Sequence, residues 1–263
     1  MITQVGLPLK ISAVLQDRDL GLPISTAKST TLFCIPHAGG SAAYYTHFGN
    51  FFSNRISFEP LELAGRGKRC RDPLGTSMES ISRDLLTQII PVARKSPYAL
   101  FGHSMGALLA LLCTIKAQSC RVPLPQALFL SAAATPEIFM KTQENPISDL
   151  PPDQMWESLV GLNGIPECIN MSMDFRKYLE PILYADFKAL DTWNPSKFSP
   201  IPVPITVFLG DKDGMLTERK ALKWRDFTTK KFSMRCFKGN HFYLQDHWSS
   251  LATHITDQLS QVA

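Results

Sequence analysis

The sequence predicts an α/β fold, with a mostly parallel central sheet and helices on both faces. From about residue 30 onward, short apolar runs alternate with longer amphipathic segments, as in strands joined by crossover helices. One glycine-flanked serine, Ser104, lies where a strand-like run meets a helix-like segment. The 263 residues suit a single domain of this kind with one insertion.

Each predicted strand is a short apolar run, and each predicted helix is a longer segment with apolar residues at helical spacing. The predicted strands are Thr31–Pro36, Ile56–Leu61, Tyr98–Phe101, Ala127–Ser131, Ile205–Leu209 and Ser233–Phe237. The predicted helices are Ala42–Phe52, Ser77–Ala93, Gly106–Ala117, Leu216–Phe227 and Gln245–Leu259. Residues 1–28 have no clear period, so we expect an N-terminal arm there and the domain over residues 29–263.

The segment around Ser104 has the context of a nucleophile elbow. The strand predicted over Tyr98–Phe101 must turn sharply into a helix rich in Ala and Leu. Gly102 and Gly106 relieve the crowding at such a bend, so we expect the Ser104 hydroxyl to project at the top of the sheet. The helix begins beneath Ser104, and its positive end would face an oxyanion formed there.

The alternation stops between about residues 135 and 200, where prolines are frequent. Helices are predicted there over Pro152–Gly161 and Met173–Thr192, the first with a proline in its opening turn. Because these helices are inserted after the strand at Ala127–Ser131, we predict that residues 135–200 form a lid over the site. The alternative is that they only pack on the edge of the sheet.

A serine hydroxyl becomes an effective nucleophile when a base takes its proton and an acid orients that base. An acid and then a histidine follow the ends of the last two predicted strands, where open parallel sheets place their sites. We therefore predict Ser104, Asp213 and His241 as the catalytic residues. Asp211 is the alternative acid, and otherwise a residue that stabilises its turn.

The other histidines have plainer interpretations. His247 and His254 fall within a helical pattern and are expected at the surface. We expect His103 to pack beside the nucleophile and His37 to line the pocket. A structural hydrogen bond in a turn is the alternative role for His241.

Two backbone N–H groups are needed to stabilise an oxyanion. Met105, directly after the nucleophile, is predicted to supply one. The other is predicted from Ala38, with His37 as the alternative, in the turn of small residues after the first strand. A phosphate-binding loop is excluded there, because the turn has neither G-x-G-x-x-G nor a G-K-[ST] ending.

Several motifs lie along the chain, some around the predicted site residues and others in the insertion. They are Pro36-His-Ala-Gly-Gly-Ser-Ala, Leu63-Ala-Gly-Arg-Gly, Gly102-His-Ser-Met-Gly-Ala, Gly210-Asp-Lys-Asp and Gly239-Asn-His-Phe-Tyr-Leu, and, in the insertion, Ile147-Ser-Asp-Leu, Leu162-Asn-Gly-Ile-Pro and Tyr184-Ala-Asp-Phe-Lys-Ala. Over about residues 30 to 260, this set resembles the type II thioesterases, the stand-alone α/β-hydrolases that accompany non-ribosomal peptide and polyketide synthases. One departure is Ala64, where that family commonly has proline.

The resemblance implies an α/β-hydrolase fold with a helical lid, and Ser104, Asp213 and His241 as the family's triad. It implies hydrolysis of acyl thioesters on the phosphopantetheine arm of an acyl or peptidyl carrier protein, which clears stalled or aberrant units. No cofactor or metal is expected. Arg66, Lys68, Arg69 and Arg71 could meet an acidic carrier protein, or could simply be solvated surface.

Three other functions remain open at this stage. A carboxylesterase or lipase would use the same acyl-serine chemistry on the same fold. An acyltransferase or a product-releasing enzyme would use the same site with a different acceptor. A hydrolase-like binding protein without activity is the third, although such a protein would usually have lost one triad residue.

Composition excludes some other classes of function. The formal net charge of +4 is modest and forms no basic stripe with interleaved aromatics, so no nucleic-acid partner is expected. The charge-free stretch between Lys95 and Lys116 is interrupted by Pro97 and the Ser104 motif, so no membrane insertion is expected. Six cysteines without a CxxC pair, and no signal-peptide pattern, favour a cytoplasmic protein. The oligomeric state is left open.

Overall fold

A computed structural model describes residues 29–141, 146–161, 172–195 and 197–261; the predicted N-terminal arm, residues 1–28, lies outside the described residues. The strands are β1 (Thr30–Ile35), β2 (Ile56–Pro60), β3 (Tyr98–His103), β4 (Leu128–Ser131), β5 (Ile205–Gly210) and β6 (Phe232–Phe237). They form one sheet in the order β2-β1-β3-β4-β5-β6, in which every neighbouring pair is parallel. The predicted α/β fold is confirmed.

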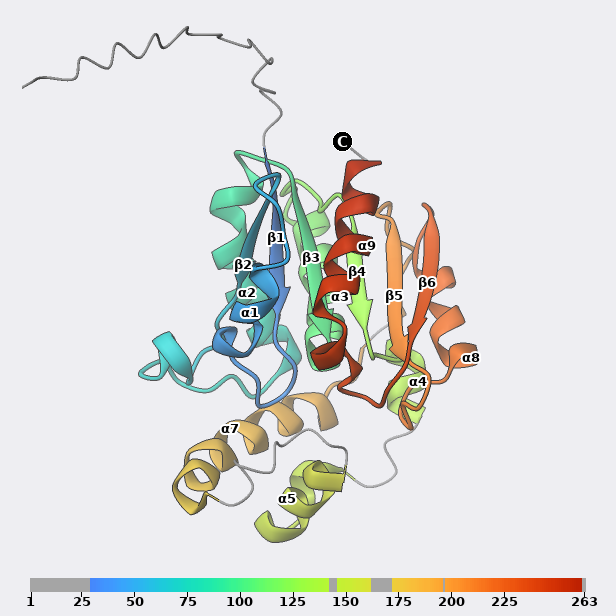
Figure 1. Cartoon of the computed structure of the whole chain (residues 1–263). Coiled ribbons are helices and arrows are strands. Elements are labelled where there is room, and N and C mark those ends of the chain that lie inside the picture. Colours follow the sequence, from blue (N-terminus) through green and yellow to red (C-terminus); the bar gives the residue numbers. More distant parts are fainter. Residues whose placement is uncertain (1–28, 142–145, 162–171, 196, 262–263) are drawn as a thin grey trace, which may run out of the picture.

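Helices connect and flank these strands (Figure 1). They are α1 (Thr46–Gly49), α2 (Met78–Ala93), α3 (Met105–Ser119), α4 (Pro136–Lys141), α5 (Pro152–Gly161), α7 (Met173–Asp191), α8 (Glu218–Ala221) and α9 (Trp248–Ser260). Short 3-10 turns occupy Ala42–Tyr45, Gly67–Arg69, Ile147–Asp149, Leu222–Phe227 and Tyr243–Asp246. Among the described residues, none of the helices is long and apolar enough to cross a bilayer.

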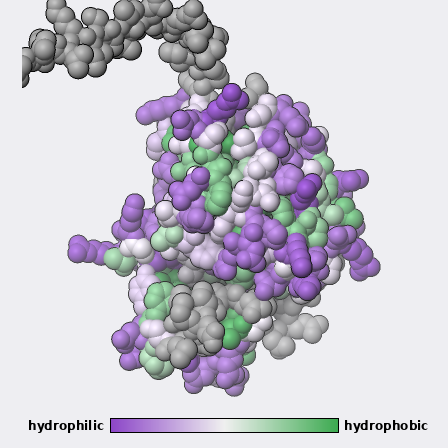
Figure 2. Space-filling view, in the orientation of Figure 1, coloured by the Kyte–Doolittle hydropathy of each residue, from purple (hydrophilic) through white to green (hydrophobic). Residues whose placement is uncertain are grey.

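The sheet has an apolar core on each face. Because successive side chains of a strand point to opposite faces, Phe33 and Ile35 join the core beneath α2 and α3, whereas Leu32 and Cys34 join the core beneath α1 and α9. Every residue of the central strands β1, β3, β4 and β5 is buried. Figure 2 shows the surface of the molecule on the side seen in Figure 1; it is mostly hydrophilic, with apolar residues in scattered patches.

Three predicted helices are shorter than expected by several residues of α-helix, whereas the others differ from their predicted bounds by at most two residues at an end. The predicted helix over Ala42–Phe52 is a 3-10 turn followed by the single α-turn of α1, which ends at Gly49, a poor helix former. The predicted helix over Leu216–Phe227 is one turn of α-helix, α8, followed by a 3-10 turn. The last helix begins only at Trp248, because the φ of His247, −127°, is not helical.

Strand β3 runs two residues beyond its predicted end at Phe101. Gly102 pairs with Ile35 of β1 and His103 pairs with Ser131 of β4, so both remain in the ladder. The strand therefore reaches the residue directly before Ser104, and α3 begins directly after it. The turn between them is a single residue long.

The helices inserted between β4 and β5 lie beyond the carboxyl ends of the strands (Figure 1). The predicted segments Pro152–Gly161 and Met173–Thr192 form α5 and α7, and α7 starts at the N-cap Ser172, whose side chain accepts a hydrogen bond from the Phe175 N–H. Helix α4 was not predicted. The Leu162–Pro166 motif lies outside the described residues. That this region acts as a lid stays a prediction.

Candidate active site

Ser104 occupies the single-residue turn between β3 and α3. Its backbone has φ 54° and ψ −119°, a conformation that L-residues adopt only under strain. The flanking glycines allow the sharp bend: a Cβ on Gly102 would lie 2.1 Å from the Gly106 carbonyl oxygen, and a Cβ on Gly106 would lie 2.2 Å from the Ile35 carbonyl oxygen. The Ser104 N–H donates to the Ser131 carbonyl at 2.8 Å, which ties the turn to β4.

His241 and Asp213 meet beside this turn, although 28 residues separate them in the chain. His241 Nδ1 lies 2.9 Å from Asp213 Oδ2, and both side chains are buried. Asp213 Oδ1 accepts the backbone N–H groups of Met215 and Leu216 at 2.8 and 3.3 Å, so the carboxylate is held from both sides. This is the arrangement in which a carboxylate orients an imidazole ring.

Asp211, the alternative acid, contacts a different group. Its Oδ1 accepts the Gly239 N–H at 2.8 Å and so joins the loop after β5 to the loop after β6. The two loops run close together there, because a Cβ on Gly210 would lie 2.4 Å from the carbonyl oxygens of Gly239 and Asn240. The structure thus places Asp213 against His241 and leaves Asp211 to hold the loops.

The two predicted oxyanion donors lie along the same cavity as Ser104. Met105 is the first residue of α3, so its N–H has no acceptor within the helix and is available to an oxyanion. In the turn after β1, the Gly39 N–H is bonded to Asp186 and the Gly40 N–H to the His37 carbonyl, at 2.7 and 2.9 Å. This arrangement is compatible with Ala38 as the second donor, and that role stays a prediction.

Two buried histidines surround His241. His37 Nδ1 lies 2.8 Å from the Tyr45 hydroxyl, and burial, together with the charges of His241 and Arg66, lowers the pKa of His37 to about 3. The His103 ring centroid is 5.2 Å from that of His241, and burial lowers the pKa of His103 well below its ordinary value. Both rings are therefore neutral at neutral pH, and they do not repel the positive charge that His241 would gain as a base.

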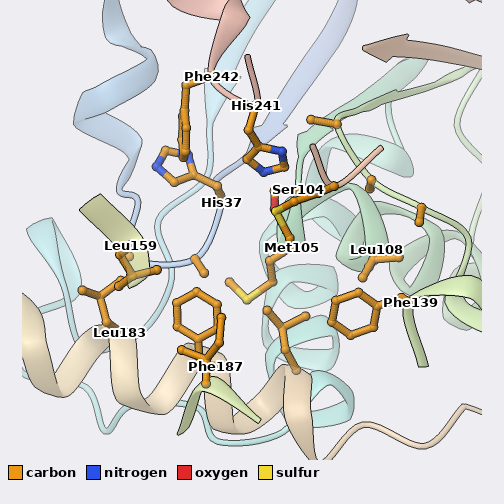
Figure 3. A pocket seen from close by; sticks show the side chains of 18 of the residues that line it. His37, Ser104, Met105, Leu108, Phe139, Leu159, Leu183, Phe187, His241 and Phe242 are labelled. Atoms are coloured by element: carbon orange, nitrogen blue, oxygen red, sulfur yellow. The ribbon is translucent and has the colours of Figure 1, made fainter. Parts of the chain in front are cut away.

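A cavity of about 380 Å³ opens at Ser104 and is mainly apolar (Figure 3). Figure 3 shows Ser104 between His241 and Met105, with Leu183 and Phe187 of α7 across the cavity. The other labelled apolar side chains are Leu108 of α3, Phe139 of α4, Leu159 of α5 and Phe242, which follows His241. Since α4, α5 and α7 supply much of this wall, an acyl chain attached to Ser104 would lie against the inserted helices.

Sequence reasoning missed the buried partners of this site. Asp186 of α7 is fully buried and pairs with Arg66, 120 residues earlier in the chain. Both residues belong to motifs quoted above, but no role was predicted for Asp186, and Arg66 was expected at the surface. A carboxylate on the apolar face of a predicted helix was the available signal, because a buried charge requires a partner.

The same pairing corrects the expectation for the basic residues between 66 and 71. Arg66 is only 2% exposed and therefore cannot face a partner protein. Arg69 is bonded to Asp84 and Asp72. Of the four, only Lys68 and Arg71 are exposed.

A parallel sheet whose central strand ends in a strained serine turn, with an acid and a histidine on the loops after the last two strands, is the architecture of the α/β-hydrolases. The chain is a member of this class. A model of the thioesterase domain matches residues 30–259. The chain belongs to the thioesterase family and is a thioester hydrolase.

Individual relatives agree with this assignment. The chain is 32% identical over 241 residues to the gramicidin S biosynthesis protein GrsT of Aneurinibacillus migulanus, covering 91% of this chain and 92% of that protein. It is also 32% identical over 234 residues to the thioesterase TesA of Mycobacterium leprae, covering 89% and 88% of the two chains.

Solved structures give the same result. ClbQ from the colibactin NRPS/PKS pathway has a TM-score of 0.83 at 29% identity, covering 89% of this chain and 98% of ClbQ. The type II thioesterase BorB from the borrelidin biosynthetic cluster has a TM-score of 0.78 at 27% identity, covering 88% and 93%. BorB is thus a type II thioesterase and ClbQ comes from an NRPS/PKS pathway, which agrees with the family that the motifs of this chain resemble.

Proposed function

We propose that this enzyme hydrolyses acyl thioesters carried on the phosphopantetheine arm of acyl or peptidyl carrier proteins, and so removes stalled or aberrant acyl groups during non-ribosomal peptide or polyketide synthesis. The observation that carries this proposal is the buried Asp213–His241 hydrogen bond beside Ser104, at the mouth of an apolar cavity. The relatives named above, from gramicidin S, colibactin and borrelidin biosynthesis, support the carrier-bound substrate.

The first half of the reaction forms an acyl-enzyme. His241 takes the proton of Ser104 while the Ser104 Oγ attacks the thioester carbonyl carbon. The tetrahedral oxyanion accepts hydrogen bonds from the N–H groups of Met105 and Ala38. The carbon–sulfur bond then breaks, and the pantetheine thiol leaves with the proton held by His241.

The second half releases the acid. His241 takes a proton from a water molecule, which attacks the acyl-Ser104 carbonyl and forms a second tetrahedral intermediate on the same two N–H groups. The ester bond to Ser104 breaks, the Oγ regains the proton from His241, and a carboxylic acid departs. A thiol has a pKa of about 8.5 and leaves more readily than an alcohol or an amine, so the first half makes less demand on the general acid.

The lining of the cavity supports an alkyl or other apolar acyl group as substrate. Leu183 and Phe187 of α7 and Leu108 of α3 offer no hydrogen bond to a polar chain. The partner is then a carrier protein outside the cavity, with only the acyl group and the thioester reaching Ser104. No cofactor is required by this scheme.

We also propose a cytoplasmic location. Cys34 and Cys113 are buried free thiols, and burial raises the pKa of Cys113 to about 12, which keeps it protonated and unreactive. Protein recovered in the cytoplasmic fraction of the source cells would support this location, and protein recovered outside them would contradict it.

The test compares one short acyl group on a carrier-protein thioester with the same group on an oxygen ester, using the wild type and Ser104→Ala. Faster cleavage of the thioester, abolished by Ser104→Ala, is the expected result. Equal or faster cleavage of the oxygen ester would indicate a carboxylesterase or lipase. Transfer of the acyl group to an added nucleophile in place of water would indicate an acyltransferase. If neither substrate is turned over, the protein would be a binding protein without activity.

A further inference from the structure

A buried ion pair links the inserted helix α7 to the loop after β2. Arg66 Nη1 and Nη2 donate to the two carboxylate oxygens of Asp186 at 2.6 and 2.7 Å. The side chains are 3% and 0% exposed. Two buried charges cost free energy unless they are well paired, and their hydrogen-bond geometry fixes the relative position of the elements that carry them.

Both members of this pair also bond to the turn after β1. Asp186 Oδ2 accepts the Gly39 N–H at 2.7 Å, and Arg66 Nη1 donates to the Gly40 carbonyl at 3.2 Å. One helical turn before Asp186, Leu183 packs directly on the same turn, since a Cβ on Gly39 would lie 2.4 Å from Leu183 Cδ2. The turn is therefore held both by side chains of α7 and by Arg66.

These contacts determine the direction of the Ala38 N–H. The Gly40 N–H donates to the His37 carbonyl at 2.9 Å. That carbonyl and the Ala38 N–H belong to one planar trans peptide unit, so they point in opposite directions. Holding Gly39 and Gly40 thus orients the Ala38 N–H, without any contact between the ion pair and Ser104.

We propose that Arg66 and Asp186 are positioning residues that hold the Ala38 N–H where the oxyanion forms. The proposal rests on the function proposed above, in which Ala38 supplies one oxyanion donor. An oxyanion exists only in the tetrahedral states, so disturbing its donor lowers kcat and leaves the KM for substrate nearly unchanged. A purely structural ion pair would instead change the amount of folded enzyme.

The first test uses single variants, Asp186→Asn, Arg66→Met and Arg66→Lys. Steady-state hydrolysis of p-nitrophenyl butyrate, corrected for the folded fraction by active-site titration, gives kcat and KM. We expect kcat to fall by about 10- to 100-fold in Asp186→Asn and Arg66→Met, with KM within about threefold of wild type. Arg66→Lys keeps a donor for Asp186 and is expected to retain more activity than Arg66→Met.

A double variant separates positioning from stability. Replacing a whole buried ion pair by apolar residues often restores stability, whereas removing one partner does not. Arg66→Met combined with Asp186→Leu is therefore expected to have a higher Tm than Arg66→Met alone but to keep its low kcat, because the bonds to Gly39 and Gly40 are still absent. Recovery of wild-type kcat in the double variant would overturn the proposal.

The matched control is Asp84→Asn, which breaks the two-point ion pair of Arg69 on the same loop, a pair with no contact to the turn after β1. Affinity for a butyl trifluoromethyl ketone, which forms a tetrahedral adduct with a nucleophilic serine, should fall with kcat in the Arg66 and Asp186 variants and stay at the wild-type value in Asp84→Asn. Equal losses in all of these variants would contradict the proposal.

Failure of the two proposals can be told apart. If the wild type cleaves the ester but not the carrier-protein thioester, the proposed function fails, and the role of Arg66 and Asp186 can still be measured on the ester. If the wild type cleaves the thioester while Asp186→Asn retains full kcat, the positioning role fails and the proposed function stands.

Discussion

At the scale of single residues, the site divides its polar groups between chemistry and support. Asp213 and Asp211 are two residues apart, yet one bonds to the His241 ring and the other to the Gly239 backbone. Ser104 is half-buried at its turn and has a strained backbone conformation, which costs roughly 1–3 kcal/mol. Hydrogen bonds from β4 and the start of α3 hold it there.

The pair of aspartates yields a sharp prediction. Asp213→Asn is expected to lower kcat by about 10³-fold, because a neutral amide cannot stabilise a positively charged His241 ring. Asp211→Asn is expected to change kcat by less than about threefold. Because it weakens one hydrogen bond, it should lower the free energy of unfolding by about 1 kcal/mol. Thioester hydrolysis and urea unfolding of both variants measure these effects. The reverse order of activities would assign Asp211 as the acid.

At the scale of elements, the strand–turn–helix unit of β3 and α3 is the most tightly constrained part of the site. A Cβ on Gly106 would lie 2.2 Å from the carbonyl oxygen of Ile35 in β1, so α3 packs closer to the sheet here than any side chain larger than glycine's would allow. This contact fixes the distance between Ser104 and the loops that carry its partners.

Gly106→Ala is expected to destabilise the fold by about 3 kcal/mol, because the new Cβ meets backbone atoms that cannot move aside as a side chain can. The control is Gly161→Ala at the end of α5, where no atom of the described residues lies within 4 Å of an added Cβ. That variant should stay within about 1 kcal/mol of wild type. Urea unfolding followed by circular dichroism gives both values, and equal stability of the two variants would contradict the packing argument.

The sequence was informative wherever neighbouring residues determine the structure. The Gly-His-Ser-Met-Gly turn could be predicted because its glycines, strand and helix are adjacent in the chain. The early end of α1 and the late start of α9 could not, because packing and the backbone of His247 decide them. The Arg66–Asp186 pair joins residues 120 positions apart, and no local pattern links them.

At the scale of the whole molecule, the cavity lies between the sheet core and the helices inserted after β4. Its floor is the turn of Ser104 and the first turns of α3, which belong to the sheet core. Its opposite wall is α7, with Leu183, Phe187 and Leu190. An acyl group attached to Ser104 would thus lie between the sheet core and the inserted helices.

Phe187→Ala is expected to change the preferred acyl length. Removing the ring enlarges the cavity, so the kcat/KM ratio of an octanoyl to a butanoyl thioester should rise by about tenfold, the contribution of a few partly buried methylenes. The control Phe175→Ala removes a ring of α7 that is 38% exposed and is not part of the cavity lining. An unchanged ratio in Phe187→Ala, or the same rise in the control, would contradict the inference that α7 lines the acyl site.

Acid should destabilise the folded state through its buried histidines. The pKa of His37 is about 3 in the folded state, against 6.5 for an ordinary histidine. Below pH 6.5 His37 is protonated in the unfolded chain but stays neutral in the folded chain. The contribution of His37 to the free energy of unfolding is therefore fully present above pH 6.5 and is lost as the pH drops toward 3. Between pH 6.5 and 5.0 this amounts to about 2 kcal/mol for His37, and His103 acts in the same direction.

The measurement is the free energy of urea unfolding at pH 7.0, 6.0 and 5.0. His37→Gln is expected to reduce the fall in stability between pH 7.0 and 5.0, whereas His47→Gln, at an exposed position, should keep the wild-type fall. An identical pH dependence in wild type and His37→Gln would show that His37 does not resist protonation in the folded state.

The two buried thiols described above sit in different layers of the molecule: Cys34 in the core beneath α1 and α9, and Cys113 in the core beneath α2 and α3. Each can be alkylated only when its own layer opens. The rates at which the two thiols react therefore time the opening of the two layers separately. Equal rates would mean that the helical layers on both faces of the sheet open in one cooperative event. Unequal rates would identify the layer that opens first.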